Sequence, residues 1–330
     1  MMTGFRAYRI DQQDKKIVAG FCSMSIDELT EGDVIIKVSH STINYKDALA
    51  ATGVGRILRK YPLNGGIDLA GTVIGSEDER FSEGDAVLVN GCGLSETVDG
   101  GYAEYARVAG DAVVPLPEGI NAEQSMQIGT AGYTAALAIH RMEQNGQRPE
   151  NGPIVVTGAT GGVGSLAIDM LDARGYEVVA VTGKSDQADY LKSIGARQIL
   201  SRDDIDLGSR PMEKAQWAGA IDNLGGDTLA WLTRTMDYGG NIASIGLAQS
   251  YELNTTVMPF ILRAVNLLGI NSVDTPRDLR LQVWARVGDD LRPRHLDKIA
   301  GNTISFDELP NAFQAFVDGK VTGRTVVAIA

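Results

Sequence analysis

The sequence predicts an α/β protein in which a doubly wound parallel sheet accompanies a smaller β-rich domain. Three observations support this fold class. The β-branched run 155–157 ends in a glycine-rich turn, and an apolar helical pattern follows at once. Two further strand segments separated by a second helical pattern complete a βαβαβ unit, which is half of a doubly wound sheet. The first 120 or so residues instead contain short strands with turn signals between them.

The glycine-rich turn has the composition of a dinucleotide-binding loop. Its fingerprint is AxGxxG, with Ala159 in the first glycine slot and Gly161 and Gly164 in the other two. In such a turn, backbone N–H groups and a helix N-terminus face a pyrophosphate. The alternative is a glycine-rich turn in an unrelated α/β domain, but the flanking pattern favours a nucleotide site. We therefore expect cofactor contacts at Thr160, Gly161, Gly162, Val163 and Gly164.

The segments after this turn continue the same alternation. A strand at 177–181 follows the end of the first helix, and a helical pattern from Ala188 to Ile194 leads to a third short strand at 198–200. The fourth strand is expected at 218–222 and a helix at 228–236. Strands at 240–246 and 267–270 complete the predicted sheet.

The N-terminal segments indicate a compact, barrel-like β domain. Strands are expected at 34–38, 70–75 and 85–89, and the alternating segment 102–108 indicates a half-buried strand. Pro115–Gly119 marks the exit from this region, and a helix is expected at 121–141. A helix at 309–316 and a strand at 324–329 return to the first domain. We place the β-rich domain at residues 1–122 and 300–330, and the nucleotide domain at 123–299.

The end of the second predicted strand decides between the two nicotinamide cofactors. An NAD site usually carries an acid there, about 20 residues past the glycines, to hold the ribose hydroxyls. This chain has Thr182, Gly183 and Lys184 instead, and Arg202 follows the third strand. Hydroxyls and cations suit a 2′-phosphate, although both basic residues are also explained as ordinary solvated charges. The missing acid favours NADPH.

Composition excludes other functional classes. The 330 residues are 44% hydrophobic and 22% charged, as in an ordinary globular protein. A formal charge of −12 argues against nucleic-acid binding, although a local basic pocket could still accept an anionic substrate. Two distant cysteines suit a reducing compartment, and no apolar run approaches the roughly 18 residues of a membrane span. We expect a cytoplasmic protein with no membrane association.

Six segments together carry a family resemblance: residues 41–47 (STINYKD), 65–71 (GGIDLAG), 128–135 (IGTAGYTA), 158–164 (GATGGVG), 256–263 (TVMPFILR) and 323–325 (GRT). With them the chain resembles the medium-chain dehydrogenase/reductase superfamily, and more narrowly its zinc-independent quinone-oxidoreductase branch. It is similar throughout its length to the NADPH-dependent acryloyl-CoA reductase group of that branch. The resemblance implies a GroES-like β-rich catalytic domain joined to a Rossmann NADPH-binding domain, with the substrate expected in the cleft between them.

The residues themselves argue against zinc. Zinc-dependent members of the superfamily place a Cys near the position of Asn44 and a His–Glu pair where this chain has Ile67 and Asp68. A structural site of four cysteines is impossible with two, and the three histidines lack ligand spacing. We expect no metal.

Without zinc, reduction of an activated C=C bond fits the resemblance, with hydride delivered to the β-carbon and a proton to the α-carbon. Tyr45 is the candidate to orient the substrate or donate the proton, and it is also expected to contact the cofactor; packing in a turn is the alternative. Asn44 is a candidate to polarise the carbonyl or hold the carboxamide, or else caps a turn. Asp47 and Asp68 are expected to order that loop. The resemblance further implies cofactor contacts at Thr130, Leu247, Ile261, Ser272 and Gly319.

The basic residues Arg56, Arg59 and Lys60 are candidates for a CoA phosphate site, against a solvated loop as the alternative. Arg324 could serve substrate, cofactor or domain packing, and we assign it to the substrate. The rival functions are a quinone or general enone reductase with the same NADPH site, and a non-enzymatic NADPH-sensing or structural protein. The apolar edge segment 265–270 would favour association if it were exposed, and the resemblance implies a homodimer, because members of the family often pair such edges across a two-fold axis.

Overall fold

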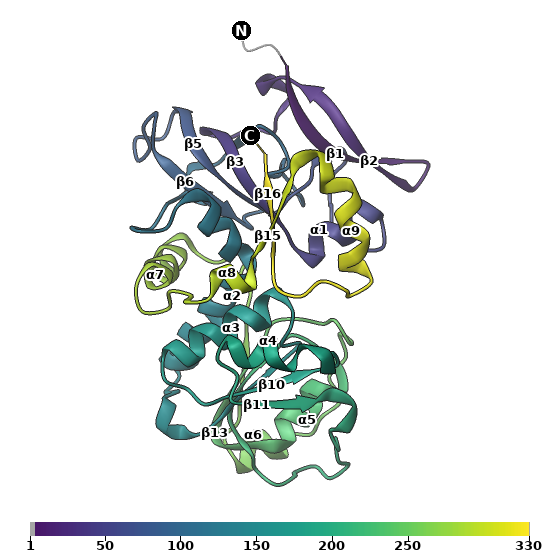
Figure 1. The fold of residues 1–330 in the computed structure, drawn as a ribbon, viewed down its shortest axis with the longest axis vertical. Coiled ribbons are helices and arrows are strands. Elements are labelled where there is room, and N and C mark those ends of the chain that lie inside the picture. The colour runs from purple at the N-terminus through teal and green to yellow at the C-terminus, as the bar shows by residue number, and fades with distance from the viewer. Residues whose placement is uncertain (1–3, 330) are drawn as a thin grey trace. The chain divides into compact units, whose positions relative to one another are not determined.

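The computed structural model describes residues 4–329 and divides into two compact units (Figure 1). The first unit comprises residues 1–130, 273–282 and 300–330, and the second comprises 131–272 and 283–299. The domain bounds expected from the sequence stay a prediction. Among the described residues, no helix is both long enough and apolar enough to cross a bilayer.

The second unit is built on a six-stranded parallel sheet with the order β11-β10-β9-β12-β13-β14. Numbered from β9, this order is 3-2-1-4-5-6, the arrangement of a doubly wound dinucleotide-binding sheet. The order reverses between β9 and β12, so a crevice is expected at their carboxyl ends. The strands are β9 (Ile154–Thr157), β10 (Val178–Thr182), β11 (Gln198–Ser201), β12 (Trp217–Asp222), β13 (Met236–Ser244) and β14 (Asn266–Gly269).

Helices cover both faces of this sheet. Figure 1 shows α3 (Gly162–Ala173) and α4 (Ala188–Ser193) on one face and α5 (Gly226–Thr235) and α6 (Met258–Leu262) on the other. Strands buried on both faces need apolar side chains throughout, and β9 and β10 are buried along their full length. Trp217, Trp231 and Leu232 fill the layer between β12 and α5.

The first unit contains a three-stranded sheet, β2-β1-β4, and a seven-stranded sheet, β15-β16-β3-β5-β6-β8, in which β7 also pairs with β3. Their bounds are β1 (Phe5–Gln13), β2 (Lys16–Met24), β3 (Val34–Ile43), β4 (Leu63–Asn64), β5 (Asp68–Ser76), β6 (Ala86–Asn90), β7 (Tyr105–Val108), β8 (Val114–Pro115), β15 (Asn302–Ser305) and β16 (Thr325–Ala328). The C-terminal strand β16 pairs antiparallel with β3, with Thr325 opposite Ile43. Residues 325–328 therefore lie beside residues 40–43.

Two helices pack together in this unit: α1 (Tyr45–Thr52) and α9 (Leu309–Val317). Both bury apolar side chains, such as Ala48 and Phe313, in one core with the sheet. Helix α2 (Ala122–Gln144) starts in the first unit, and its backbone leaves helical geometry at Gly129. The remaining helices are α7 (Arg277–Gly288) and α8 (Leu296–Ile299).

The strands and helices expected in the nucleotide half are all present within a few residues of their predicted bounds. The fifth strand, β13, begins four residues earlier than the sequence indicated. In the β-rich half, the strand expected at 102–108 is confined to 105–108. The backbone N–H groups of residues 100–102 instead donate to the carbonyls of residues 64–66. Helix α1 was not predicted. Its eight residues include polar and small side chains that give a weak apolar pattern.

Candidate functional site

The glycine-rich turn joins β9 to α3 in the geometry of a phosphate-binding loop. Gly158 has φ 59°, and its carbonyl accepts the N–H of Gly161 at 3.0 Å. A Cβ on Gly164 would lie 2.4 Å from the carbonyl oxygen of Gly158, so no side chain fits at this position. The turn therefore brings the five predicted residues 160–164 to the start of α3, whose N-terminus favours an anion.

Hydrogen bonds hold β9 to β12 at the point where the strand order reverses. The Thr157 hydroxyl donates to the carboxylate of Asp222 at 2.7 Å, and the Asn223 side chain donates to the Thr157 carbonyl at 2.7 Å. Asp222 also accepts the backbone N–H of Gly225 at 2.9 Å. Burial raises the pKa of Asp222 despite these bonds. The hydrogen bond between Thr157 and Asp222 therefore joins the ends of β9 and β12 beside the glycine-rich turn.

The residues predicted to distinguish the cofactors lie together at the ends of β10 and β11. Thr182 pairs with Ser201 in these parallel strands, so Lys184 and Arg202 follow neighbouring strand ends. The Arg202 guanidinium packs over Gly183, where a Cβ would meet Nη2 at 3.0 Å. Burial lowers the pKa of Lys184, and its backbone N–H donates to the Thr182 hydroxyl at 3.0 Å. This arrangement places the Thr182 hydroxyl and two basic residues at neighbouring strand ends, with the carboxylate of Asp203 at 3.5 Å from the Arg202 guanidinium.

In the first unit, Tyr45 is the first residue of α1 and is 50% exposed. Asn44 precedes it and is buried, and its carbonyl accepts the N–H groups of Asp47 and Ala48. The carboxylate of Asp47 accepts the backbone N–H of Asn44 at 2.8 Å. Asn44 and Asp47 therefore fix the start of α1. The exposed phenol of Tyr45 comes directly after the buried Asn44 in the chain.

Thr130 and Asp68 lie together in the same unit. The carboxylate of Asp68, the first residue of β5, accepts the Thr130 hydroxyl at 2.6 Å and the Thr130 N–H at 3.0 Å. Gly129 makes this contact possible with φ 51° and ψ −160°, a conformation essentially restricted to glycine. A Cβ there would lie 2.6 Å from Nη2 of Arg324 and 3.0 Å from Oδ2 of Asp68.

Arg324 is only 4% exposed, and its guanidinium is held by four acceptors in its own unit. It donates to the Asn44 side-chain oxygen at 3.0 Å and to the Thr42 hydroxyl at 2.8 Å. It also donates to the carbonyls of Ile43 and Gln127 at 3.4 and 3.3 Å. Burial lowers its pKa. These contacts differ from those of an accessible substrate-binding cation, and they favour the packing role that the sequence had left open.

The carboxylates of Asp47 and Asp68 lie near the buried guanidinium of Arg324. Burial is the main cause that raises the pKa of Asp47 from 3.8 to about 7, and the negative charge of Asp68 raises it further against the hydrogen bonds from Asn44 and Ile67. The pKa of Asp47 therefore lies near neutral pH.

The remaining predicted site residues lie on separate segments. Arg56 and Arg59 are exposed on the loop after α1, and Arg59 lies 3.9 Å from the carboxylate of Glu96. Lys60 is exposed on the same loop. Glu96 also pairs with Lys46, so part of the positive charge in this region is already matched. Elsewhere, Leu247 and Ile261 are exposed apolar side chains, Ser272 is half-buried after β14, and Gly319 is exposed after α9.

The donor set near Asn44 does not fit zinc. Ile67 has a hydrocarbon side chain, the Asn44 amide is bonded to Arg324 and two carboxylates, and Asp68 is bonded to Thr130. A guanidinium at the oxygen of Asn44 would repel a divalent cation. Within residues 4–329, no group of three or more His, Cys, Asp or Glu side chains has a metal-binding arrangement.

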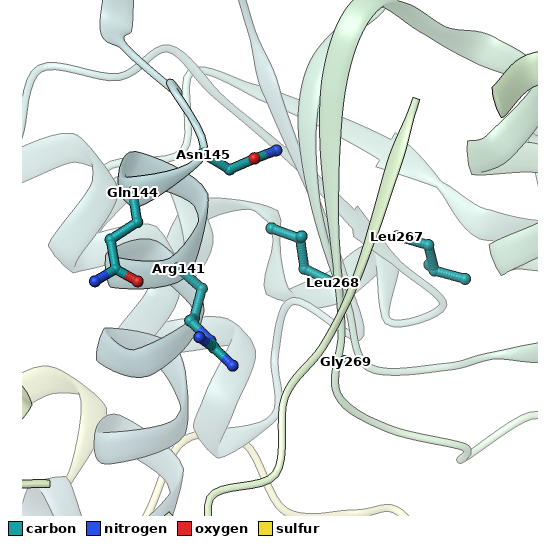
Figure 2. Close-up of a pocket in the computed structure, with 6 residues that line it drawn as sticks. All are labelled: Arg141, Gln144, Asn145, Leu267, Leu268 and Gly269. Carbon is teal, nitrogen blue, oxygen red and sulfur yellow. The ribbon is translucent and has the colours of Figure 1, made fainter. Parts of the chain in front are cut away.

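A separate pocket of about 380 Å³ lies in the second unit and includes none of the predicted site residues. Arg141, Gln144 and Asn145 line one side, and residues 267–269 of the edge strand β14 line the other. Figure 2 shows Leu268 directed toward the helix that carries Arg141 and Gln144, whereas Leu267 points to the opposite side.

Sequence reasoning missed the connection between Asn44, Asp68, Thr130 and Arg324. Each was noted in a separate motif, but Asp68 was not given a site role and Gly129 was quoted without its backbone conformation. The one available signal was the polar pair Asn44 and Asp47 at the spacing of a helix start, Asn-x-x-Asp.

Each of the two units contains a segment that matches a known protein family. Residues 30–118 match the family described as the alcohol dehydrogenase GroES-like domain, and residues 162–287 match the zinc-binding dehydrogenase family. The Bacillus subtilis protein named "Putative quinone oxidoreductase YhfP" is 46% identical over 330 residues, which are 100% of both chains. A crystal structure of YhfP with NAD bound has a TM-score of 0.96 and covers 99% of this chain and 100% of that one.

Two further relatives extend over nearly the whole chain. AcuI of Ruegeria pomeroyi, named an acrylyl-CoA reductase, is 45% identical over 320 residues, which are 97% of both chains. The crystal structure of YhdH from Escherichia coli K-12 with bound NADPH has a TM-score of 0.94 at 48% identity, and covers 98% of this chain and 100% of that one.

Proposed function

The chain belongs to the medium-chain dehydrogenase/reductase family, and from this premise we propose that it is an NADPH-dependent reductase of a short 2-enoyl-CoA thioester. The proposed reaction converts acryloyl-CoA to propanoyl-CoA. The observation that carries the substrate class is the similarity to AcuI over 97% of both chains, because that relative is named for this reaction. The fold and the polar cluster around Asn44 are compatible with it.

The proposed cofactor is NADPH, bound through the glycine-rich turn. Lys184 and Arg202 support it, since they follow adjacent strand ends and the end of β10 carries Thr182 and Gly183 in place of the acid that would hold a 2′-hydroxyl. The E. coli relative with bound NADPH supports the same cofactor, whereas NAD in YhfP makes NADH the alternative. We further propose the predicted nicotinamide-side contacts at Thr130, Leu247, Ile261, Ser272 and Gly319.

In the proposed reaction, the bound cofactor supplies a hydride to the β-carbon of the substrate. Negative charge then develops on the thioester oxygen, and a proton adds to the α-carbon. Tyr45 carries an exposed hydroxyl at a fixed helix start and is the proposed group for orienting the substrate or delivering that proton. Asn44 directs its amide inward, so we propose that it supports this helix start.

A second candidate is quinone or enone reduction with the same cofactor, favoured by the name of the YhfP relative. The discriminating experiment follows NADPH oxidation with acryloyl-CoA and with a simple benzoquinone in parallel. Preference for the thioester by kcat/KM supports the proposal, and preference for the quinone refutes it.

The exposed Arg56 gives this experiment a second arm. Arg56→Glu is expected to raise KM for acryloyl-CoA and leave KM for benzoquinone nearly unchanged, because only the thioester carries phosphates. Equal effects on both acceptors would remove Arg56 from the proposed CoA site.

We also propose a homodimer formed through β14. This strand ends the sheet order and pairs with β13 alone among the described strands, and Leu267 is exposed on it. An unpaired edge can add a strand from a second copy. Light scattering at micromolar concentration tests this, and a monomeric mass would refute it. The cytoplasmic location stays a prediction.

A further inference from the structure

The carboxylate of Asp68 is fully buried and receives hydrogen bonds from two segments far apart in the sequence. Oδ2 accepts the side-chain N–H of Asn44 at 2.8 Å, which ties it to the start of α1. Oδ1 accepts the hydroxyl of Thr130 at 2.6 Å, which ties it to the kink in α2. One side chain therefore connects the residue before Tyr45 with the residue after Gly129.

The Asn44 amide has a single orientation that satisfies its neighbours. Its nitrogen donates to Asp47 at 3.1 Å and to Asp68 at 2.8 Å, and its oxygen accepts from Arg324 at 3.0 Å. A flipped amide would direct its oxygen at two carboxylates and its N–H groups at a guanidinium. Both amide hydrogens are thus used inside the cluster, and a rotation of Asn44 would break three contacts at once.

The Thr130 hydroxyl is equally constrained. The hydroxyl donates its proton to the carboxylate of Asp68 at 2.6 Å, and the backbone N–H of Thr130 donates to the same carboxylate at 3.0 Å. A hydroxyl has one proton to donate, so that of Thr130 can take part in a further hydrogen bond only as an acceptor. Thr130 is therefore unsuited to protonating a substrate, and suited to meeting an amide N–H.

We propose that Asp68 is a positioning residue. It holds the start of α1, which carries Tyr45, in a fixed position relative to Thr130, and it fixes the Thr130 hydroxyl as an acceptor. The ligand chemistry that matches an acceptor at this point is a primary amide, such as the carboxamide of a nicotinamide. This inference rests on the proposed function for its catalytic consequence, but the coupling of the two segments does not.

The coupling is tested without substrate or cofactor. Hydrogen exchange is measured by mass spectrometry on the cofactor-free protein, in peptides covering residues 44–52 and 126–134. Asp68→Asn is expected to raise exchange about tenfold or more in both segments, because an amide cannot accept from all these donors. The matched control is Asp99→Asn, since Asp99 is a buried acid of the same unit that accepts from Thr30 and Asn64. An increase in one segment alone, or an equal increase in the control, would overturn the coupling.

The catalytic consequence is tested on the holoenzyme with the acceptor that the wild type reduces. Asp68→Asn is expected to lower kcat about tenfold to a hundredfold through misplacement of Tyr45, with a smaller change in KM for the acceptor. Asp99→Asn is expected to lower Tm with kcat retained. Unchanged kcat in Asp68→Asn would refute the positioning role. If the wild type reduces neither acceptor, the proposed function fails while the exchange experiment still decides the coupling.

Thr130 provides variants that do not depend on how Asp68→Asn folds. Thr130→Val keeps the side-chain shape and removes the hydroxyl, whereas Thr130→Ser keeps the hydroxyl and its bond to Asp68. We expect Thr130→Val to weaken NADPH binding about tenfold, measured by nicotinamide fluorescence, and Thr130→Ser to recover most of that loss. Equal affinities of the two variants would refute the acceptor role.

Discussion

Arg324 donates a hydrogen bond to the side-chain oxygen of Asn44 at 3.0 Å, although 280 residues separate them in the chain. The pairing of β16 with β3 brings them together, because Thr325 lies opposite Ile43. Neither residue faces solvent, since Arg324 is 4% and Asn44 9% exposed. The residue exposed beside them is Tyr45, so the buried pair supports the helix start that carries the proposed catalytic phenol.

The first prediction concerns Tyr45 itself. Tyr45→Phe removes the hydroxyl and keeps the ring, and we expect kcat for the thioester to fall about a hundredfold if this hydroxyl serves proton transfer. Tm should stay close to that of the wild type, because half of the side chain is exposed. Tyr238→Phe, at a tyrosine that is 78% exposed in the other unit, is the control. An undiminished kcat in Tyr45→Phe would exclude the phenol from the reaction.

The second prediction concerns cofactor choice. Arg202→Ala should raise KM for NADPH about tenfold to a hundredfold and leave KM for NADH nearly unchanged, because only NADPH carries the 2′-phosphate. Arg197→Ala is the matched control, since Arg197 is an exposed arginine just before β11 that lies 4.0 Å from Glu177. Parallel changes in the two KM values would contradict the assignment of Arg202.

The third prediction follows from the raised pKa of Asp47. The folded pKa of about 7 exceeds the ordinary value of 3.8, so the folded state holds a proton that the unfolded chain releases. This contribution to stability is fully present below about pH 4 and is lost as the pH rises through about 7. Between these limits the free energy of unfolding should fall by about 1.4 kcal/mol for each tenfold decrease in proton concentration.

Urea unfolding across this pH range measures the effect as the difference between wild type and Asp47→Asn. The free energy of unfolding of the wild type should fall relative to the variant as pH rises. Asp222, whose pKa burial also raises, is present in both proteins and cancels in the difference. A difference that does not change with pH would show that Asp47 is ionised throughout.

The fourth prediction concerns Gly129. Gly129→Ala places a Cβ against Arg324 and Asp68 and also forces a side chain into a conformation that costs about 1–3 kcal/mol. We expect a larger loss of Tm than in Gly146→Ala, because Gly146 also has positive φ but no atom within 4 Å of its added Cβ. Calorimetry of both variants measures this difference, and equal Tm losses would mean that the cluster can rearrange.

The doubly wound sheet could be predicted from the sequence because its signals are local. The apolar run before Gly158, the glycines and the helix after them occupy consecutive residues, and β10 and β11 repeat the pattern. The strand order also follows from the motif that the turn identifies. For the same reason the candidate cofactor residues at 160–164 and 182–184 could be named in advance.

The polar cluster of the first unit could not be predicted in the same way. Asn44, Asp68, Thr130 and Arg324 come from four segments, and their contacts depend on strand register and on the backbone of Gly129. Sequence patterns report which face of a strand is buried, but they do not report which buried polar groups meet. Arg324 was accordingly assigned to the substrate, whereas its four acceptors all belong to the protein.

The central claim is hydride transfer to the β-carbon of an enoyl thioester, and isotope transfer tests it most directly. The enzyme is incubated with acryloyl-CoA and NADPH deuterated at the transferable position of the nicotinamide, and the product is analysed by NMR and mass spectrometry. The account predicts propanoyl-CoA with one deuterium on the terminal carbon of the acyl group and a solvent proton at the α-carbon. Deuterium at the α-carbon, or unchanged acryloyl-CoA beside rapid reduction of a benzoquinone, would contradict it.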